Sequence, residues 1–173
     1  MVVTAVLAVS GCLGLPPNVL PVSNFELDRY MGQWFEIARL DHSFERGLEA
    51  VTATYSRRKD DGIAVLNKGY NAKKQEWSEA EGKASFVQGS TEGHLKVSFF
   101  GPFYSSYVVF ELGEEYQYAY VSGPTTEYLW LLARQPTVDK ERIAHFEQTV
   151  RALGYDTEKI LYPTQSTAER PAR

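Results

Sequence analysis

The stretch Gly32-Gln33-Trp34-Phe35-Glu36-Ile37-Ala38-Arg39 decides how this chain is interpreted. It joins a Gly-x-Trp motif to a strand-like run that starts at Trp34. Near the other end of the chain, residues 128–134 read Tyr-Leu-Trp-Leu-Leu-Ala-Arg and form a second strand-like run that closes on a basic residue. A Gly-x-Trp match alone is weak evidence. The sequence between the two runs therefore has to show whether they belong to one architecture.

Length and composition fit one β-rich domain. The chain has 173 residues, enough to bury a core without disulfides. Aromatic residues make up 13%, with 11 Tyr and 9 Phe, and this enrichment favours strands. A formal net charge of −4 provides no basic surface, so no nucleic-acid partner is expected.

Short strand-like runs alternate with turn signals from residue 33 onwards, which is typical of an all-β barrel or sandwich. Asp61-Gly62 is a two-residue hairpin signal. The tight spacing of the runs favours antiparallel neighbours in an up-and-down meander. We expect eight strands, at residues 34–41, 50–58, 63–70, 76–88, 93–99, 105–112, 115–122 and 127–134.

The hydrophobic period changes after residue 136 and predicts a single amphipathic helix. Its apolar face consists of Ile143, Phe146, Val150 and Leu153. Thr137 or Asp139 can cap its start, and Gly154 suits the position after its last turn.

These features together resemble the signature of the lipocalins. The resemblance covers residues 25–163 and implies an all-β fold: an eight-stranded antiparallel up-and-down barrel with one C-terminal α-helix packed outside. In that family the residue matching Gly32 allows a tight turn, and the one matching Trp34 closes the floor of the barrel. The arginine matching Arg134 packs over the indole in a cation–π contact. The expected loop at residues 41–49 would lie across the open mouth.

Several segments narrow the resemblance to the bacterial outer-membrane lipocalins and their apolipoprotein D relatives. They are residues 34–39, 51–56, 67–70, 95–103 and 130–134. The family's middle motif, usually Thr-Asp-Tyr, is replaced by Glu114-Glu115-Tyr116. We expect the turn at this motif to survive, with Glu acting in place of Asp.

The start of the chain resembles a bacterial lipoprotein signal. Residues 1–9 are almost wholly apolar and lead into Val9-Ser10-Gly11-Cys12. The run is shorter than the about 20 residues of a membrane span and fits a signal peptide, although no Lys or Arg precedes it. We expect a signal peptide at 1–11, a tether at 12–24, the lipocalin domain at 25–163 and a loose tail at 164–173. Lipidated Cys12 would be the membrane anchor, and Leu13 favours the outer membrane, facing the periplasm of a Gram-negative bacterium.

The motifs of common enzymes and cofactor sites are missing from the sequence. There is no Gly-x-Ser-x-Gly, no phosphate loop, no dinucleotide fingerprint and no His-Glu-x-x-His. The three histidines lie far apart, so no metal site is expected. We predict neither a cofactor nor catalytic residues, since Cys12, the one cysteine, precedes the expected barrel.

The alternation of side chains along the strands predicts which residues line the cavity. If Trp34 faces inward, so do Glu36 and Ala38. A buried carboxylate at Glu36 needs a donor, such as Asn67 or a Tyr, or a raised pKa. It could contact a ligand or belong to a structural network, and the sequence leaves both open. The resemblance places Trp130 in the pocket wall. The expected ligand-binding set is Glu36, Ala38, Ala53, Tyr55, Asn67, Leu95, Val97, Phe99, Tyr107, Tyr118 and Trp130.

The leading hypothesis is a lipid-binding outer-membrane lipoprotein that carries or stores fatty acids or lysophospholipids. Apolar walls with a few polar tips suit an acyl chain and its head. One alternative is a structural or interaction lipoprotein with a filled barrel. A less favoured one is a lipid-modifying enzyme on the same barrel. The sequence leaves open whether the chain forms a homodimer.

Overall fold

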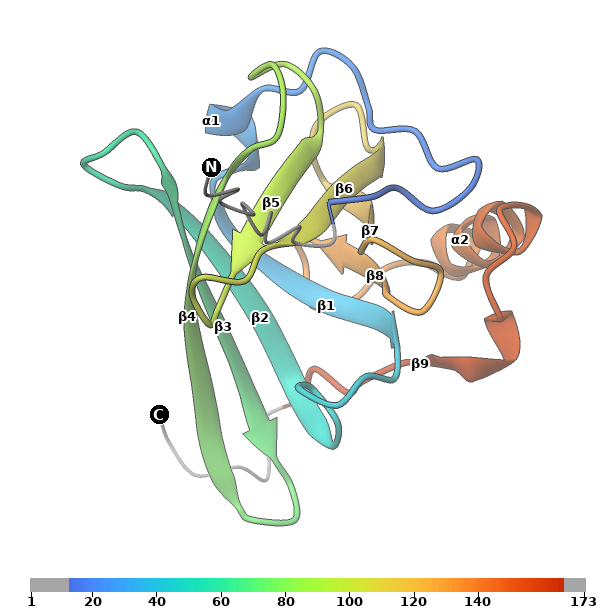
Figure 1. Ribbon diagram of the computed structural model, residues 1–173. Coiled ribbons are helices and arrows are strands. Elements are labelled where there is room, and N and C mark those ends of the chain that lie inside the picture. The colour runs from blue at the N-terminus through green and yellow to red at the C-terminus, as the bar shows by residue number, and fades with distance from the viewer. Residues whose placement is uncertain (1–12, 167–173) are drawn as a thin grey trace, which may run out of the picture.

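Eight antiparallel strands follow one another along the chain and close into a barrel in the computed structural model, which describes residues 13–166 (Figure 1). Each strand pairs with the next, and β1 also pairs with β8, so the sheet closes on itself. The strands are β1 (Gly32–Leu40), β2 (Leu48–Arg57), β3 (Ile63–Asn71), β4 (Glu76–Phe86), β5 (His94–Ser98), β6 (Ser105–Leu112), β7 (Tyr118–Ser122) and β8 (Leu129–Ala133). The predicted fold class is confirmed.

One helix, α2 (Lys140–Ala152), packs on the outside of the barrel (Figure 1). Asp139 caps it, because its carboxylate accepts a hydrogen bond from the Arg142 amide at 2.7 Å. Phe146 and Val150 are fully buried against the barrel wall. Gly154 follows the helix at φ +91°, a left-handed conformation that glycine adopts without strain. The predicted helix and its cap are confirmed.

Three short elements were not predicted. A single turn, α1 (Leu27–Tyr30), precedes β1, and a 3₁₀ turn, η1 (Thr157–Lys159), leads into β9 (Ile160–Leu161). β9 adds two residues to the far end of β1. Each is too short for a periodic pattern to identify.

The segments on either side of the barrel domain are held to it where the structure describes them. Val22 exchanges backbone hydrogen bonds with Val109 and Gly93, both at 2.9 Å. At the other end, Thr164 accepts a hydrogen bond from the Ala50 amide at 2.8 Å, so the tail starts later than the predicted residue 164. The predicted signal peptide and Cys12 lie outside the described residues.

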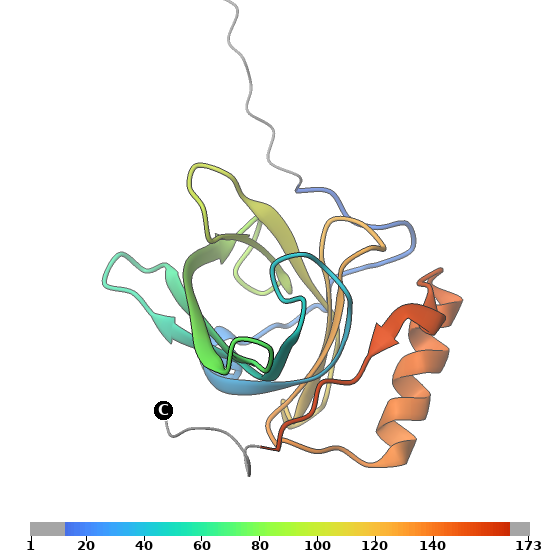
Figure 2. The same ribbon diagram turned by 90° about the horizontal axis from the view of Figure 1, so that it is seen from below.

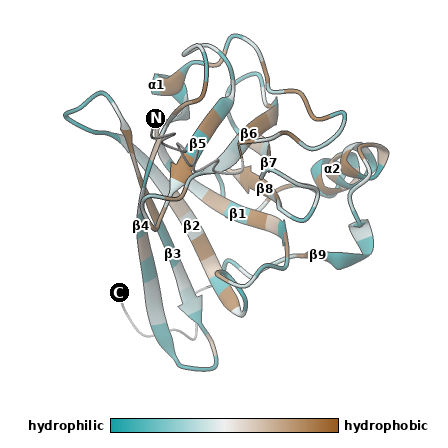
Figure 3. Ribbon diagram, viewed as in Figure 1, coloured by the Kyte–Doolittle hydropathy of each residue, from teal (hydrophilic) through white to brown (hydrophobic). Residues whose placement is uncertain are grey.

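The strands carry apolar side chains on two faces, which gives two separate clusters. Figure 3 shows hydrophobic residues spread along the strands instead of on one side of the sheet. The inner cluster fills the barrel around Trp34, and the outer cluster lies between the barrel and α2. Within residues 13–166, no helix combines the length and apolar character needed to span a bilayer.

Candidate functional site in the barrel interior

The closed end of the barrel is built around Trp34, which is fully buried. The Arg134 guanidinium lies 3.9 Å from the centre of the indole ring. It also donates hydrogen bonds to the backbone oxygens of Arg29 at 2.7 Å and Gln33 at 2.9 Å. Arg134 therefore joins α1 and β1 to the end of β8. The predicted cation–π pair is present.

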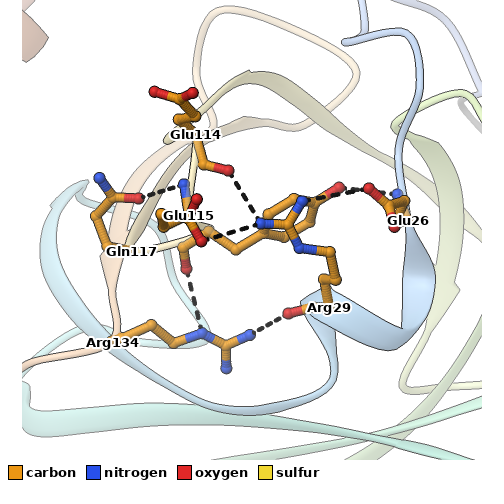
Figure 4. Close-up of polar contacts among 7 residues, drawn as sticks. Glu26, Arg29, Glu114, Glu115, Gln117 and Arg134 are labelled. Carbon is orange, nitrogen blue, oxygen red and sulfur yellow. Dashed lines mark hydrogen bonds and ion pairs between the residues drawn. The ribbon is translucent and has the colours of Figure 1, made fainter.

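The turn between β6 and β7 completes this end (Figure 4). Arg29 donates to the Glu114 carbonyl oxygen at 3.1 Å and lies 3.5 Å from the Glu115 carboxylate. Its guanidinium stacks over the Tyr116 ring at 4.3 Å. The turn expected at this motif is present, and the Tyr116 amide donates a hydrogen bond to the Gly113 oxygen across it. These contacts brace the closed end of the barrel.

Three tyrosine hydroxyls meet just inside this floor. Tyr107 on β6 lies at the centre, with its oxygen 2.7 Å from that of Tyr30 on α1 and 2.8 Å from that of Tyr55 on β2. Burial raises the pKa of all three phenols, so they stay protonated at neutral pH. Tyr30 also packs against Trp34, with their ring centres 4.7 Å apart.

Above the floor, the inner walls are apolar and partly exposed. Most of the predicted lining belongs to the inner cluster, namely Ala53, Tyr55, Leu95, Val97, Phe99, Tyr107 and Trp130. Asn67 pairs with Ala53 across β2 and β3 and so shares its face. Val97, Tyr107 and Trp130 belong to this inner cluster and are not fully buried.

Two hollows of about 540 and 440 Å³ lie on the outer surface, one beside the start of α2 and one beside α1. We place the candidate site in the interior instead, because apolar walls and convergent polar groups occur together there.

Two residues predicted to line the cavity lie elsewhere, which corrects their expected orientation. Ala38 and Tyr118 belong to the outer cluster next to α2, and Arg142 stacks on the Tyr118 ring. A β-bulge between Glu36 and Ala38 inserts one residue into β1, so Ala38 turns outward and Arg39 inward. On β7 the alternation runs opposite to the prediction, with Ala119 and Val121 inside.

A buried polar network lies at the mouth, and sequence reasoning found only part of it. Glu36 pairs with Arg39, not with Asn67 or a Tyr as expected. Arg39 also donates to the backbone oxygen of Glu45 at 3.0 Å. The Glu45 carboxylate in turn lies 2.8 Å from Nε2 of His42 and accepts a hydrogen bond from the Trp130 indole at 3.0 Å. Arg39, His42 and Glu45 were missed, because the loop must fold back before they meet.

This network fastens the loop at residues 41–47 over the barrel. Figure 2 looks along the barrel and shows the loop between β1 and β2 lying over the near opening. His42 is a buried residue of this loop, with its ring 3.9 Å from that of Phe44 and 5.2 Å from that of Trp130. Phe44 itself is exposed. The mouth thus has an aromatic lid held by ionisable groups.

The two buried carboxyl groups of the network titrate in opposite directions. Burial, reinforced by the nearby charge of Glu45, raises the pKa of Glu36 well above its ordinary value despite Arg39. Burial also acts to raise the pKa of Glu45. Hydrogen bonds from His42 and Trp130, together with the charge of Arg39, outweigh it and leave that pKa lowered. At neutral pH, Glu45 is therefore the ionised member that holds the loop.

In the part of the chain that the structure describes, no three His, Cys, Asp or Glu side chains gather as metal ligands would. The ionisable groups at the mouth bind one another and the backbone of the loop. The geometry suits the binding of an apolar molecule that enters past the loop.

Comparison with known proteins agrees with the fold. The family model described as "Lipocalin-like domain" matches residues 25–165. The outer membrane lipoprotein Blc of Vibrio cholerae is 62% identical over 157 residues, covering 90% of this chain and 92% of that one. Blc of Escherichia coli K12 is 49% identical, covering 87% and 85%. Insecticyanin from the tobacco hornworm, Manduca sexta, superimposes with a TM-score of 0.71 at 22% identity, covering 90% and 88%.

Proposed function

Because the chain belongs to the lipocalin family, we propose that it binds a single-tailed lipid, a fatty acid or a lysophospholipid, inside its barrel. The observation that carries the proposal is the combination of partly exposed apolar walls with a network of charged groups at the mouth. The acyl chain would lie along Val97 and Leu95 and point towards Trp34. The polar head would remain near the mouth network. Apolar burial would supply most of the affinity, at about 25 cal/mol per Å².

We propose further that the protein is a lipoprotein anchored through Cys12 in the outer membrane of a Gram-negative bacterium, facing the periplasm. The lipobox-like Val9-Ser10-Gly11-Cys12 supports this placement. So do the two Blc relatives, both of which are named outer membrane lipoproteins. In this role the protein carries or stores lipid and acts by binding, with no bond made or broken.

Fluorescence of Trp130 tests the binding proposal, because this indole faces the interior. Titration with saturated fatty acids and lysophospholipids should change its emission and saturate at about one ligand per barrel. Each added methylene should tighten binding about fourfold until the chain reaches the floor, since one buried methylene contributes about 0.8 kcal/mol. Val97→Trp should narrow the interior and weaken long chains more than short ones.

Trp77 provides the matched control. It lies on β4 and packs against Tyr70 on the outer face of the sheet, so Trp77→Phe should leave the ligand response intact. Trp130→Phe should remove most of it. A response that Trp130→Phe leaves unchanged, or an affinity that does not depend on chain length, would place the ligand outside the barrel and favour a structural lipoprotein with a filled interior.

A further inference from the structure

The floor of the barrel is polar at its centre, although an acyl chain would end there. Tyr30, Tyr55 and Tyr107 come from α1, β2 and β6, and their hydroxyl groups form one hydrogen-bonded chain. Around them lie aromatic and aliphatic side chains of the inner cluster, Trp34 among them. A floor built only to meet a methyl group would need no hydroxyl, because buried polar groups reduce stability unless they are paired.

A count of protons shows that the chain of hydroxyls can donate once more. Three phenols carry three hydroxyl protons. The two bonds to the Tyr107 oxygen use two of these. Tyr55 donates its proton to the Tyr107 oxygen. If Tyr30 also donates to Tyr107, the third proton is that of Tyr107, and if Tyr107 donates to Tyr30, the third proton is that of Tyr30. When both neighbours donate to Tyr107, its own proton is free and its hydroxyl is polarised as a donor.

The position of Tyr107 makes this donor available to a ligand. Its side chain belongs to the inner cluster and is more exposed than those of Tyr30 and Tyr55, which are 2% and 8% exposed. Burial keeps the phenol protonated, as its raised pKa indicates. Asn67 supplies a complementary acceptor, because its buried side-chain oxygen has no hydrogen-bond partner in the described structure. It faces inward on β3, two residues along from Val65, the partner of Tyr55.

We propose that the tyrosine floor binds an oxygen atom carried on the distal part of the acyl chain, such as a hydroxyl or carbonyl group. The protein would then accept oxygenated chains that a purely apolar floor rejects. A hydroxyl both donates and accepts, which suits the spare donor at Tyr107 and the acceptor at Asn67. This inference rests on the proposed function, and it specifies which lipids the same interior prefers.

The experiment compares each fatty acid with its ω-hydroxy derivative over a series of chain lengths, using Trp130 fluorescence and calorimetry. The measured quantity is the ratio of the two affinities in the wild type and in the double variant Tyr55→Phe/Tyr107→Phe. At the length that reaches the floor, the variant should shift this ratio about tenfold against the ω-hydroxy ligand, as expected for one buried hydrogen bond. The plain fatty acid serves as the reference in each ratio, and a thermal unfolding transition like that of the wild type verifies that the variant folds.

Tyr118→Phe is the matched control, because Tyr118 lies in the outer cluster and bonds to Glu111. It should leave the ratio unchanged. An equal ratio in the wild type and the double variant at every chain length would overturn the inference. So would weaker binding of plain fatty acids to a folded double variant, because the carboxyl group would then occupy the floor. If neither ligand binds the wild type, the proposed function fails first.

Discussion

At the scale of single residues, Trp34 and Arg134 matter most, because they join the first strand to the last. Trp34→Ala should reduce the free energy of unfolding by about 3–5 kcal/mol, as for other large buried aromatics. Arg134→Ala should cost less, through the lost stacking and its hydrogen bonds to backbone oxygens. In a double-mutant cycle measured by urea denaturation, the two losses should fall short of additivity by about 0.5–2 kcal/mol.

A second cycle provides the control for this prediction. Phe146 lies under α2 and belongs to the outer cluster, whereas Trp34 belongs to the inner one. The losses in the free energy of unfolding caused by Phe146→Leu and Arg134→Ala should therefore add within experimental error. Strict additivity of the Trp34 and Arg134 losses would show that the stacking seen in the structure carries no energy of its own.

The sequence identified some residues of the site for sound physical reasons and missed others. Val97 could be placed inside because apolar and polar residues alternate along its strand. Trp34 and Trp130 were placed there by the resemblance to the lipocalins, since alternation alone left their orientation open. The orientation of Ala38 could not be predicted, because a β-bulge depends on backbone pairing and has no signal in the side-chain pattern. The hydroxyl contacts of Tyr30, Tyr55 and Tyr107 were also hidden, since the three residues come from elements far apart in the chain.

At the scale of elements, the ionised carboxylate of Glu45 fastens the loop at residues 41–47 to β8, where it accepts a hydrogen bond from Trp130. The carboxylate also contacts His42 within the loop, and the backbone oxygen of Glu45 accepts the hydrogen bond from Arg39 on β1. The folded pKa of Glu45 is lowered, so its stabilising effect is present above the ordinary value of 4.5 and is lost as pH falls through the folded pKa. The pKa of Glu36 is shifted in the opposite direction, so its effect on stability depends on pH in the opposite way. Its raised pKa favours the folded state in acid, and this benefit is lost as pH rises above 4.5.

Glu45→Gln should therefore destabilise the protein by about 1–3 kcal/mol at neutral pH, because a buried charged hydrogen-bond acceptor is lost. The difference from the wild type should shrink as pH falls below about 4.5, where the wild-type group also becomes neutral. Chemical denaturation at a series of pH values measures both effects. Glu81→Gln, on the exposed face of β4, should show neither. A constant difference across the series would contradict the ionised state assigned to Glu45.

Elements were easier to predict than the contacts between them. The eight strands and α2 follow from periodic hydrophobic patterns of period two and about 3.6. The Asp139 cap and Gly154 mark the limits of α2 by local chemistry. The short α1 and β9 have no period to detect, and their positions depend on packing against the finished barrel.

At the scale of the whole molecule, the proposed membrane anchor is Cys12. Cys12→Ala in a full-length chain that carries its signal should release the protein from the membrane fraction or leave it unprocessed, since lipidation supplies the buried methylenes that anchor it. Fractionation of cells followed by mass spectrometry of the N-terminus measures the result. Ser10→Ala retains a small residue before the cysteine and should behave as the wild type. Unchanged membrane association of Cys12→Ala would refute the anchor.

The barrel can close only after its last strand has been synthesised, because β1 pairs with β8. β1 pairs with β8 through Phe35 and Ala133, so the seam joins segments from opposite ends of the domain. A chain that leaves a ribosome or translocon N-terminus first exposes β1 long before its partner arrives. Until then one edge of β1 lacks this partner and can pair with other chains. The entropy of closing so long a loop slows the final step as well. A secreted barrel of this kind must therefore be protected from aggregation for as long as its last strand takes to emerge.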